Sequence, residues 1–240
     1  MTIACIAGTE PGLQARIEPF QFSQRQMPQV WFTADTHLGH ANIIKYCQRP
    51  FLNSEEQRLL AEEPRGKWRV SRESVERHDE ALLDAINACV KADDTLWVLG
   101  DFCWGGLATV RAHLERIQCK YVNLVWGNHD NRTIGEAFNK TLEQGMVTIR
   151  WQRIWLNHYP MRSWDGRFHG SWHLYGHVHG RLVNEDADRM SLLARDVGVD
   201  VCEYQPVSFD QLAEYMSPRV KAFEAGKAAY LTGDLSKCIE

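Results

Sequence analysis

The residues best suited to chemistry in this 240-residue chain are carboxylate, imidazole and carboxamide side chains gathered in five short clusters. The clusters occupy residues 35–42, 100–101, 127–130, 157–160 and 176–180. Carboxylate oxygens, neutral imidazoles and one carboxamide suit divalent ions such as Mn²⁺, Fe²⁺ or Zn²⁺ in five- or six-coordinate geometry. Because no cluster contains a cysteine, a thiolate zinc site is not indicated.

Each cluster alone is a weak signal, since an Asp or His after a strand is more often a cap or a turn residue. His177 and His179 are two positions apart, so both rings lie on one face of a strand or turn. Metal ligands have this arrangement, but so do histidines on a protein surface. Five such clusters together are hard to produce by chance. Seven ligands are too many for one tetrahedral ion and fit two ions that share a bridging carboxylate. Two metals about 3.5–4 Å apart clamp the attacking and leaving oxygens of an in-line phosphoryl displacement and generate hydroxide near neutral pH. The clusters therefore predict phosphate-ester hydrolysis.

Apolar runs that are typical of buried strands precede the first three clusters. Residues 30–34, 95–99 and 121–126 are rich in β-branched and aromatic side chains. Amphipathic patterns at 74–90 and 107–117 predict helices between these strands, the first capped by Ser71. This alternation predicts an α/β fold with right-handed crossovers, and it places the clusters at the carboxyl edge of the sheet.

The second half of the chain is rich in strand patterns. We expect strands at 147–151, 153–156, 173–175 and 196–201. A closing helix begins near Ser208, where Ser208 and Gln211 have the spacing of a capping box.

Two segments stand apart from this pattern. Residues 1–28 are interpreted as an irregular N-terminal arm, and residues 29–240 as a single domain. The charged insertion 53–72 is interpreted as a solvated helix and loop.

Composition narrows the function classes. The 27 basic and 31 acidic residues give a net charge of −4, which offers no electrostatic footprint for sequence-independent binding to duplex nucleic acid and leaves open a local basic groove. The seven cysteines are scattered and form no C-x-x-C pair, so we expect a reducing, cytoplasmic location. No run of 18 apolar residues occurs, and we expect no membrane partner.

The five clusters, in order, resemble the calcineurin-like metallophosphoesterase superfamily. The shared blocks are Asp-x-His, Gly-Asp, Gly-Asn-His-Asp, a lone His and Gly-His-x-His, and they run from Asp35 to His179. Residues 35–44 and 197–200 resemble small bacterial and phage members known as predicted phosphoesterases. The resemblance implies a four-layer αββα sandwich of two packed mixed sheets flanked by helices. The two-sheet arrangement follows from the resemblance alone.

The resemblance also implies a role for each residue of the clusters. The first metal would be held by Asp35, His37 and His179, the second by Asn128, His158 and His177, and Asp101 would bridge them. His129 would face the scissile bond and protonate the leaving oxygen or stabilise the transition state. Asp130 would orient or cap its neighbours. The implied cofactors are two divalent ions among Mn, Fe, Zn and Ni, with Mn expected to support activity in vitro.

Residues beside the clusters are candidates for reading the substrate. His40 could contact a substrate phosphate or simply begin a helix, and Arg162 could bind a phosphate through two hydrogen bonds. Trp104, Trp164 and Trp172 could stack on a nucleobase or sugar, although packing against the sheet edge is the commoner role of such residues.

The leading hypothesis is a dinuclear metal-dependent phosphoesterase acting on a small phosphomonoester or phosphodiester, with nucleotides as one candidate class. One alternative is a non-catalytic interaction module, which intact ligands and His129 disfavour. Another is a phosphodiesterase acting on RNA or oligonucleotide ends. Residues 102–106 lack the Val-Asp-Arg-Gly continuation typical of protein Ser/Thr phosphatases, which disfavours that class. The oligomeric state is left open.

Overall fold

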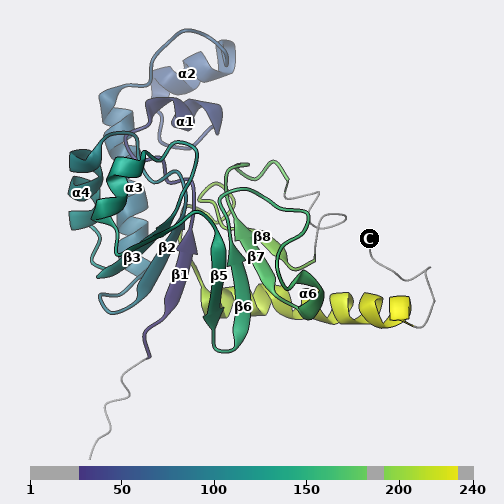
Figure 1. Ribbon diagram of the computed structural model, residues 1–240. Coiled ribbons are helices and arrows are strands. Elements are labelled where there is room, and N and C mark those ends of the chain that lie inside the picture. The colour runs from purple at the N-terminus through teal and green to yellow at the C-terminus, as the bar shows by residue number, and fades with distance from the viewer. Residues whose placement is uncertain (1–26, 183–191, 232–240) are drawn as a thin grey trace, which may run out of the picture.

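The computed structural model describes residues 27–182 and 192–231, which form two mixed β-sheets flanked by helices (Figure 1). The N-terminal arm expected at residues 1–28 lies almost entirely outside the described residues. Figure 1 shows the two sheets side by side, with α3 and α4 on the outer side of the first and α6 running past the second.

The first sheet carries the first three clusters. Its strands lie in the order β4-β3-β2-β1-β9. They are β1 (Val30–Thr33), β2 (Thr95–Leu99), β3 (Tyr121–Val125), β4 (Lys140–Leu142) and β9 (Val207–Ser208). All pairs are parallel except β1 with β9. The strands predicted at 30–34, 95–99 and 121–126 are confirmed, and their carboxyl ends share one edge.

The second sheet carries the last two clusters. Its strands lie in the order β5-β6-β7-β8, with β5 and β6 antiparallel and the other pairs parallel. They are β5 (Gly145–Ile149), β6 (Gln152–Leu156), β7 (Trp172–Tyr175) and β8 (Ala194–Asp196). The strands expected at 153–156 and 173–175 are thereby confirmed. The strand expected at 147–151 lies two residues earlier, because Arg150 and Trp151 adopt positive φ and form the turn to β6.

The strand predicted at 196–201 is wrong, because β8 ends where that prediction begins. Asp196 Oδ1 accepts a hydrogen bond of 2.8 Å from the backbone N of Gly198, which turns the chain out of the sheet. Gly198 then forms a parallel bridge with Ala34, so this segment reaches the first sheet. Val197 and Val199 are buried without belonging to a strand, which explains why their pattern resembles one.

Two long helices cover the outer face of the first sheet. α3 (Arg72–Cys89) and α4 (Leu107–Glu115) occupy the predicted positions, and the Ser71 side chain caps α3 by accepting from Ser74 N. Leu82 and Leu83 of α3 pack in one buried cluster with Val98. Each such fully buried side chain contributes roughly 1.5–3 kcal/mol relative to exposure.

The charged insertion forms a small subdomain above α3. It contains α2 (Ser54–Glu62), and α1 (Ala41–Tyr46) lies beside it (Figure 1). Most of its charged side chains are exposed, as expected, but Glu56 is buried. The Glu56 carboxylate accepts hydrogen bonds from the backbone N of Asn53 and Ser71 and from Ser74 Oγ. This residue therefore joins the insertion to the start of α3.

The main core lies between the sheets and α6 (Phe209–Leu231). Phe32 and Leu99 of the first sheet share a buried cluster with Leu174 of the second and Met216 of α6. The capping box predicted at the start of this helix is present, since Gln211 Oε1 accepts from Ser208 N and Ser208 Oγ accepts from Gln211 N. The fold is therefore the α/β arrangement that the resemblance implies. Among the described helices, none is long and apolar enough to cross a membrane.

Candidate metal centre

The seven expected ligands all follow the carboxyl ends of strands, and they come from both sheets. Asp35 and His37 follow β1, Asp101 follows β2, Asn128 follows β3, His158 follows β6, and His177 and His179 follow β7. The centre therefore lies at the seam between the sheets. The Ala34–Gly198 bridge crosses the same seam.

One compact group contains Asp35, His37 and His179, whose ligand atoms all lie within 4.8 Å of one another. Asp35 Oδ1 and His37 Nε2 are buried, and neither has a hydrogen-bond partner among the described residues. Buried polar atoms are nearly always satisfied, because leaving them unpaired costs free energy. A divalent cation would satisfy both atoms, so the residues fit a metal ion.

A second group contains Asp35, Asp101 and His158, again with ligand atoms within 4.8 Å. Burial acts to lower the pKa of His158, but the hydrogen bond to the Asp101 carboxylate outweighs it and raises that pKa. The Nδ1 of the ring donates to Leu99 O at 2.8 Å, so a neutral ring carries its lone pair at Nε2. That atom lies 3.1 Å from Asn128 Oδ1 and 3.5 Å from Asp101 Oδ2. When His158 is neutral, these electron-pair donors face one another, and a divalent ion between them would remove the repulsion, so this group also fits a metal.

Asp101 lies between the two groups. Its Oδ2 is 3.5 Å from the Nε2 of His37 and 3.5 Å from the Nε2 of His158. This symmetric position suits a carboxylate that bridges two ions. The structure adds that Asp35 belongs to both groups, whereas the resemblance places it at the first metal alone.

His177 lies beside the second group. Its ring centroid is 5.0 Å from that of His158 and 4.6 Å from that of Tyr159. Its backbone N donates to Asp35 Oδ2 at 2.8 Å. The His177 imidazole is therefore adjacent to the second group rather than inside it.

The ligand loops have an uncommon backbone conformation. Positive φ angles occur at Asp35 (57°), His37 (48°), Asp101 (55°), His177 (71°) and His179 (49°). These five are half of the ten non-glycine residues with positive φ in the part of the chain that the structure describes. Such conformations cluster at functional sites, where the surrounding structure holds them in place.

Two glycines allow the carboxylates to approach the backbone. A Cβ atom at Gly127 would collide with Asp101 Oδ1, and one at Gly176 would collide with Asp35 Oδ2. Each glycine directly precedes a ligand, Asn128 or His177. The glycines of these two clusters are thus explained by close packing against the carboxylates of the expected ligands Asp101 and Asp35.

Burial and one carboxylate set the electrostatics of the first group. Burial raises the pKa of Asp35 to about 7 and lowers the pKa of His37 to about 3. At His179 burial also acts to lower the pKa, but the hydrogen bond to Asp200 outweighs it and raises that pKa to about 10. Burial also acts to raise the pKa of Asp101, but hydrogen bonds from His158 and from the His129 backbone outweigh it and lower that pKa to about 2. A metal needs ionised carboxylates and neutral imidazoles, and the lowered pKa values of His37 and Asp101 favour these forms.

A buried arginine that sequence reasoning missed orients the first group. Arg49 is 1% exposed, and its Nε and Nη2 donate to Asp200 Oδ1 and Oδ2 at 2.9 and 2.8 Å. Asp200 Oδ2 also accepts from His179 Nδ1 at 2.7 Å, which leaves the His179 Nε2 free for a metal. Arg49 further donates to the carbonyl oxygens of Asp35 and Thr36. Only the noted 197–200 segment could have pointed to this network.

His129 lies at the exposed mouth of the centre. Its backbone N donates to Asp101 Oδ1 at 2.9 Å, and its ring centroid is 5.3 Å from that of His37. Asp130 accepts from the backbone N of Asp101, Gly127 and Phe102, so it ties the loops after β2 and β3 together. This is the orienting role expected of it.

The substrate candidates separate clearly in exposure. Trp164 and Trp172 are buried and pack in the core, whereas Trp104 is 54% exposed. His40 begins α1, and its ring stacks on Trp104. Arg162 is exposed, and among the described contacts none joins it to the ligand cluster. Its role in phosphate binding stays a prediction.

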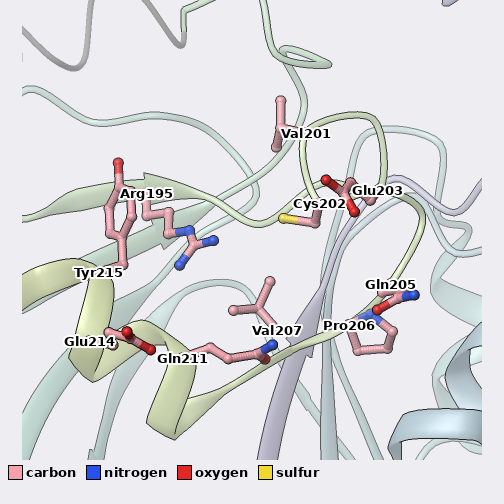
Figure 2. A pocket seen from close by; sticks show the side chains of 10 residues that line it. All are labelled: Arg195, Val201, Cys202, Glu203, Gln205, Pro206, Val207, Gln211, Glu214 and Tyr215. Carbon is pink, nitrogen blue, oxygen red and sulfur yellow. The ribbon is translucent and has the colours of Figure 1, made fainter.

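A separate cavity of about 400 Å³ lies between the 201–207 loop and α6 (Figure 2). Its lining includes Arg195, Glu203, Glu214 and Tyr215. The guanidinium of Arg195 lies over the Tyr215 ring, 4.2 Å from its centroid. None of the seven expected ligands lines this cavity, so it is distinct from the metal centre.

Comparison with known families agrees with this geometry. The model of the calcineurin-like phosphoesterase family matches residues 28–219. The chain is a calcineurin-like phosphoesterase by family. The family match covers both sheets and all seven expected ligands, so the motif order and the fold point to the same family.

The relatives of this calcineurin-like phosphoesterase carry little functional description. An uncharacterised protein of Methanocaldococcus jannaschii is 30% identical over 215 residues, 87% of this chain and 99% of that protein. The Gene 66 protein of Mycobacterium phage L5 is 32% identical over 43% of this chain and 41% of its own length. A solved protein of unknown function from Aquifex aeolicus has a TM-score of 0.55 at 20% identity, covering 78% of this chain and 98% of that one. This last likeness supports the fold.

Proposed function

We propose that this protein is a dinuclear metal-dependent phosphoesterase that hydrolyses a small phosphomonoester or phosphodiester. The observation that carries the proposal is the pair of buried, unpartnered ligand atoms, Asp35 Oδ1 and His37 Nε2, beside a second donor group that Asp101 joins to the first. Membership of the calcineurin-like phosphoesterase family supports the reaction class.

The donor set indicates which ions the centre takes. Asp35, His37 and His179 would hold one ion, Asn128, His158 and His177 the other, and Asp101 would lie between them. Oxygen and nitrogen donors of this kind suit Mn²⁺, Fe²⁺, Zn²⁺ or Ni²⁺, and we expect Mn²⁺ to support activity in vitro. When bound, two such ions neutralise the phosphoryl oxygens and lower the pKa of coordinated water.

The side chain of His129 supplies the proton that the reaction needs. Hydrolysis adds water to phosphorus and breaks the bond from phosphorus to the leaving oxygen, which must gain a proton. His129 stands at the exposed mouth, with its backbone anchored to Asp101 at 2.9 Å, so its ring can face that oxygen. Arg49, through Asp200, holds the His179 ring in the orientation that ligation requires.

The test uses metal-free protein reloaded with Mn²⁺. We expect turnover of p-nitrophenyl phosphate or of bis(p-nitrophenyl) phosphate, with two ions bound per chain by elemental analysis. Absence of turnover of both esters, while two ions are bound, overturns the proposal.

A variant of His129 separates an enzyme from a non-catalytic module. His129→Ala removes a general acid, so we expect turnover to fall by about 10²–10⁴-fold while two ions stay bound. An unchanged rate in this variant would show that the measured activity does not come from this site.

A further inference from the structure

Trp104 is a large exposed aromatic side chain at the rim of the metal centre. It is 54% exposed, although tryptophan usually packs inside a protein. One face of its indole stacks on the His40 ring, with centroids 4.6 Å apart and an angle of 12° between the planes. The proposed function does not use this pair.

The Trp104–His40 pair is held rigidly in place by the backbone. Trp104 N donates to Leu38 O at 2.7 Å, and Leu38 forms a parallel bridge with Cys103. Gly39 N donates to both carboxylate oxygens of the buried Asp79 at 2.9 Å. Because the loops that carry both rings are tied to each other and to α3, the platform is ordered before any ligand arrives.

The platform lies next to the group that handles the leaving oxygen. The Trp104 ring centroid is 5.8 Å from that of His129, and the His40 centroid is 6.0 Å from it. His40 also lies 5.4 Å from His37, a ligand of the first group. A group that leaves with a proton from His129 therefore departs on the Trp104 side of the centre.

We propose that Trp104, backed by His40, binds a planar aromatic ring in the leaving alcohol of the substrate. This inference rests on the proposed function and narrows its substrate class to esters that carry such a ring. Nucleotides and aryl phosphates are the two sources of this chemistry. Stacking on an aromatic side chain is favourable for any planar base, and it adds affinity without adding a new charge.

The reaction balances with water as the only co-reactant. Water adds to phosphorus, and the bond from phosphorus to the oxygen of the aromatic alcohol breaks. That oxygen takes a proton from His129. The proton that the attacking water gives up can restore His129, and the alcohol then leaves across Trp104.

The experiment compares esters that differ in the leaving alcohol. With Mn²⁺-loaded protein, kcat/KM is measured for adenosine 5′-monophosphate, phenyl phosphate and glycerol 3-phosphate, and for three diesters of the same alcohols. We expect the aromatic esters to exceed the glycerol esters by about tenfold or more. Adenosine and phenol, as competitive inhibitors, distinguish the nucleoside from the aryl source.

Variants of Trp104 decide whether the ring is responsible. Trp104→Ala is expected to raise KM for the aromatic esters by about tenfold. The inhibition constant of the better inhibitor should rise by the same factor, whereas KM for the glycerol esters should change less than twofold. Trp104→Phe should retain part of the preference. Trp151, 96% exposed on the β5–β6 turn, provides the control, since Trp151→Ala should change nothing.

The outcomes separate the inference from the proposed function. The inference is overturned if Trp104→Ala lowers kcat/KM equally for all esters, or if the unmodified protein does not prefer aromatic esters to glycerol esters. Either result leaves the proposed phosphoesterase activity intact. No turnover of any ester with two ions bound overturns the proposed function, and the inference falls with it.

Discussion

The Arg49 guanidinium holds the Asp200 carboxylate through two hydrogen bonds of 2.9 and 2.8 Å, although 151 positions separate the two residues. Both side chains are almost fully buried. This pair links the turn after α1 to the segment after β8, and it reaches the first group of expected ligands through His179. The Arg49–Asp200 pair therefore both stabilises the fold and positions the His179 ring.

Removing the guanidinium should destabilise the fold strongly. Arg49→Met leaves the buried Asp200 carboxylate without its cation and two backbone carbonyls without a donor, so we expect unfolding free energy to fall by about 3–5 kcal/mol. Arg58→Met is the matched control, because its ion pairs with Glu55 and Glu62 are exposed and it should lower the unfolding free energy far less. Urea unfolding of the metal-free protein measures the unfolding free energy of both variants. Equal losses in the two variants would contradict the stabilising role of the buried Arg49.

Neutralising Asp200 should weaken one metal selectively. Asp200→Asn removes the charged acceptor that faces His179 Nδ1, and loss of such a partner typically lowers metal affinity about 10–100-fold. A calorimetric Mn²⁺ titration should show one weakened binding step and one unchanged. Asp94→Asn, a buried aspartate that accepts from Gln29 N and Trp31 Nε1 instead, should leave both steps unchanged. Equal weakening of both steps would contradict a specific role at the first metal.

The charged insertion should depend on a single buried carboxylate. Glu56→Ala removes the acceptor for Asn53 N, Ser71 N and Ser74 Oγ, and we expect a loss of about 2–3 kcal/mol in unfolding free energy. Its neighbour Glu55 is exposed, and Glu55→Ala should lower the unfolding free energy far less than Glu56→Ala does. Chemical denaturation of the two variants side by side provides the measurement. If both variants lower the unfolding free energy by the same small amount, the insertion is not anchored through Glu56.

His173 should make stability fall in mild acid. Burial lowers the pKa of its imidazole from 6.5 to about 4, and Nε2 accepts from Met161 N. The unfolded chain gains a proton as the pH falls through 6.5, whereas the folded chain does not until about pH 4, so stability present above pH 6.5 is lost over this interval. The loss of unfolding free energy over this interval is about 3 kcal/mol, because each pKa unit of difference between the unfolded and the folded state corresponds to about 1.36 kcal/mol.

The matching measurement is the unfolding free energy at pH 7 and pH 4.5. We expect the difference between the two values to be smaller in His173→Gln by about 2–3 kcal/mol, because glutamine does not titrate. Other acid-sensitive groups are common to both proteins and cancel in the comparison. Identical pH dependence in the two proteins would contradict a buried, neutral His173.

Local patterns were sufficient to predict the strands that position the centre. β1, β2 and β3 are short apolar runs that end in polar clusters, and a buried parallel strand leaves this signature in any sequence. The structure then brings the residues after these strands together with those after β6 and β7. Their roles came from the resemblance to a family, since spacing alone does not assign a ligand to a metal.

What the sequence could not predict depends on contacts between distant residues. The valines at 197 and 199 have a strand pattern, but a turn made by Asp196 removes them from the sheet. Arg49 has no local signature, because its partner Asp200 lies far along the chain. Trp104 could not be distinguished from Trp164 or Trp172 until their exposure was known.

The position of the centre at the seam between the sheets has a consequence for the order of folding. The first sheet supplies Asp35, His37, Asp101 and Asn128, and the second supplies the three remaining histidines. Neither half of the chain presents a complete set of donors, so high metal affinity must appear only after the halves have docked. A divalent ion would then bind the docked state alone, so it should slow the separation of the halves more than it speeds their docking.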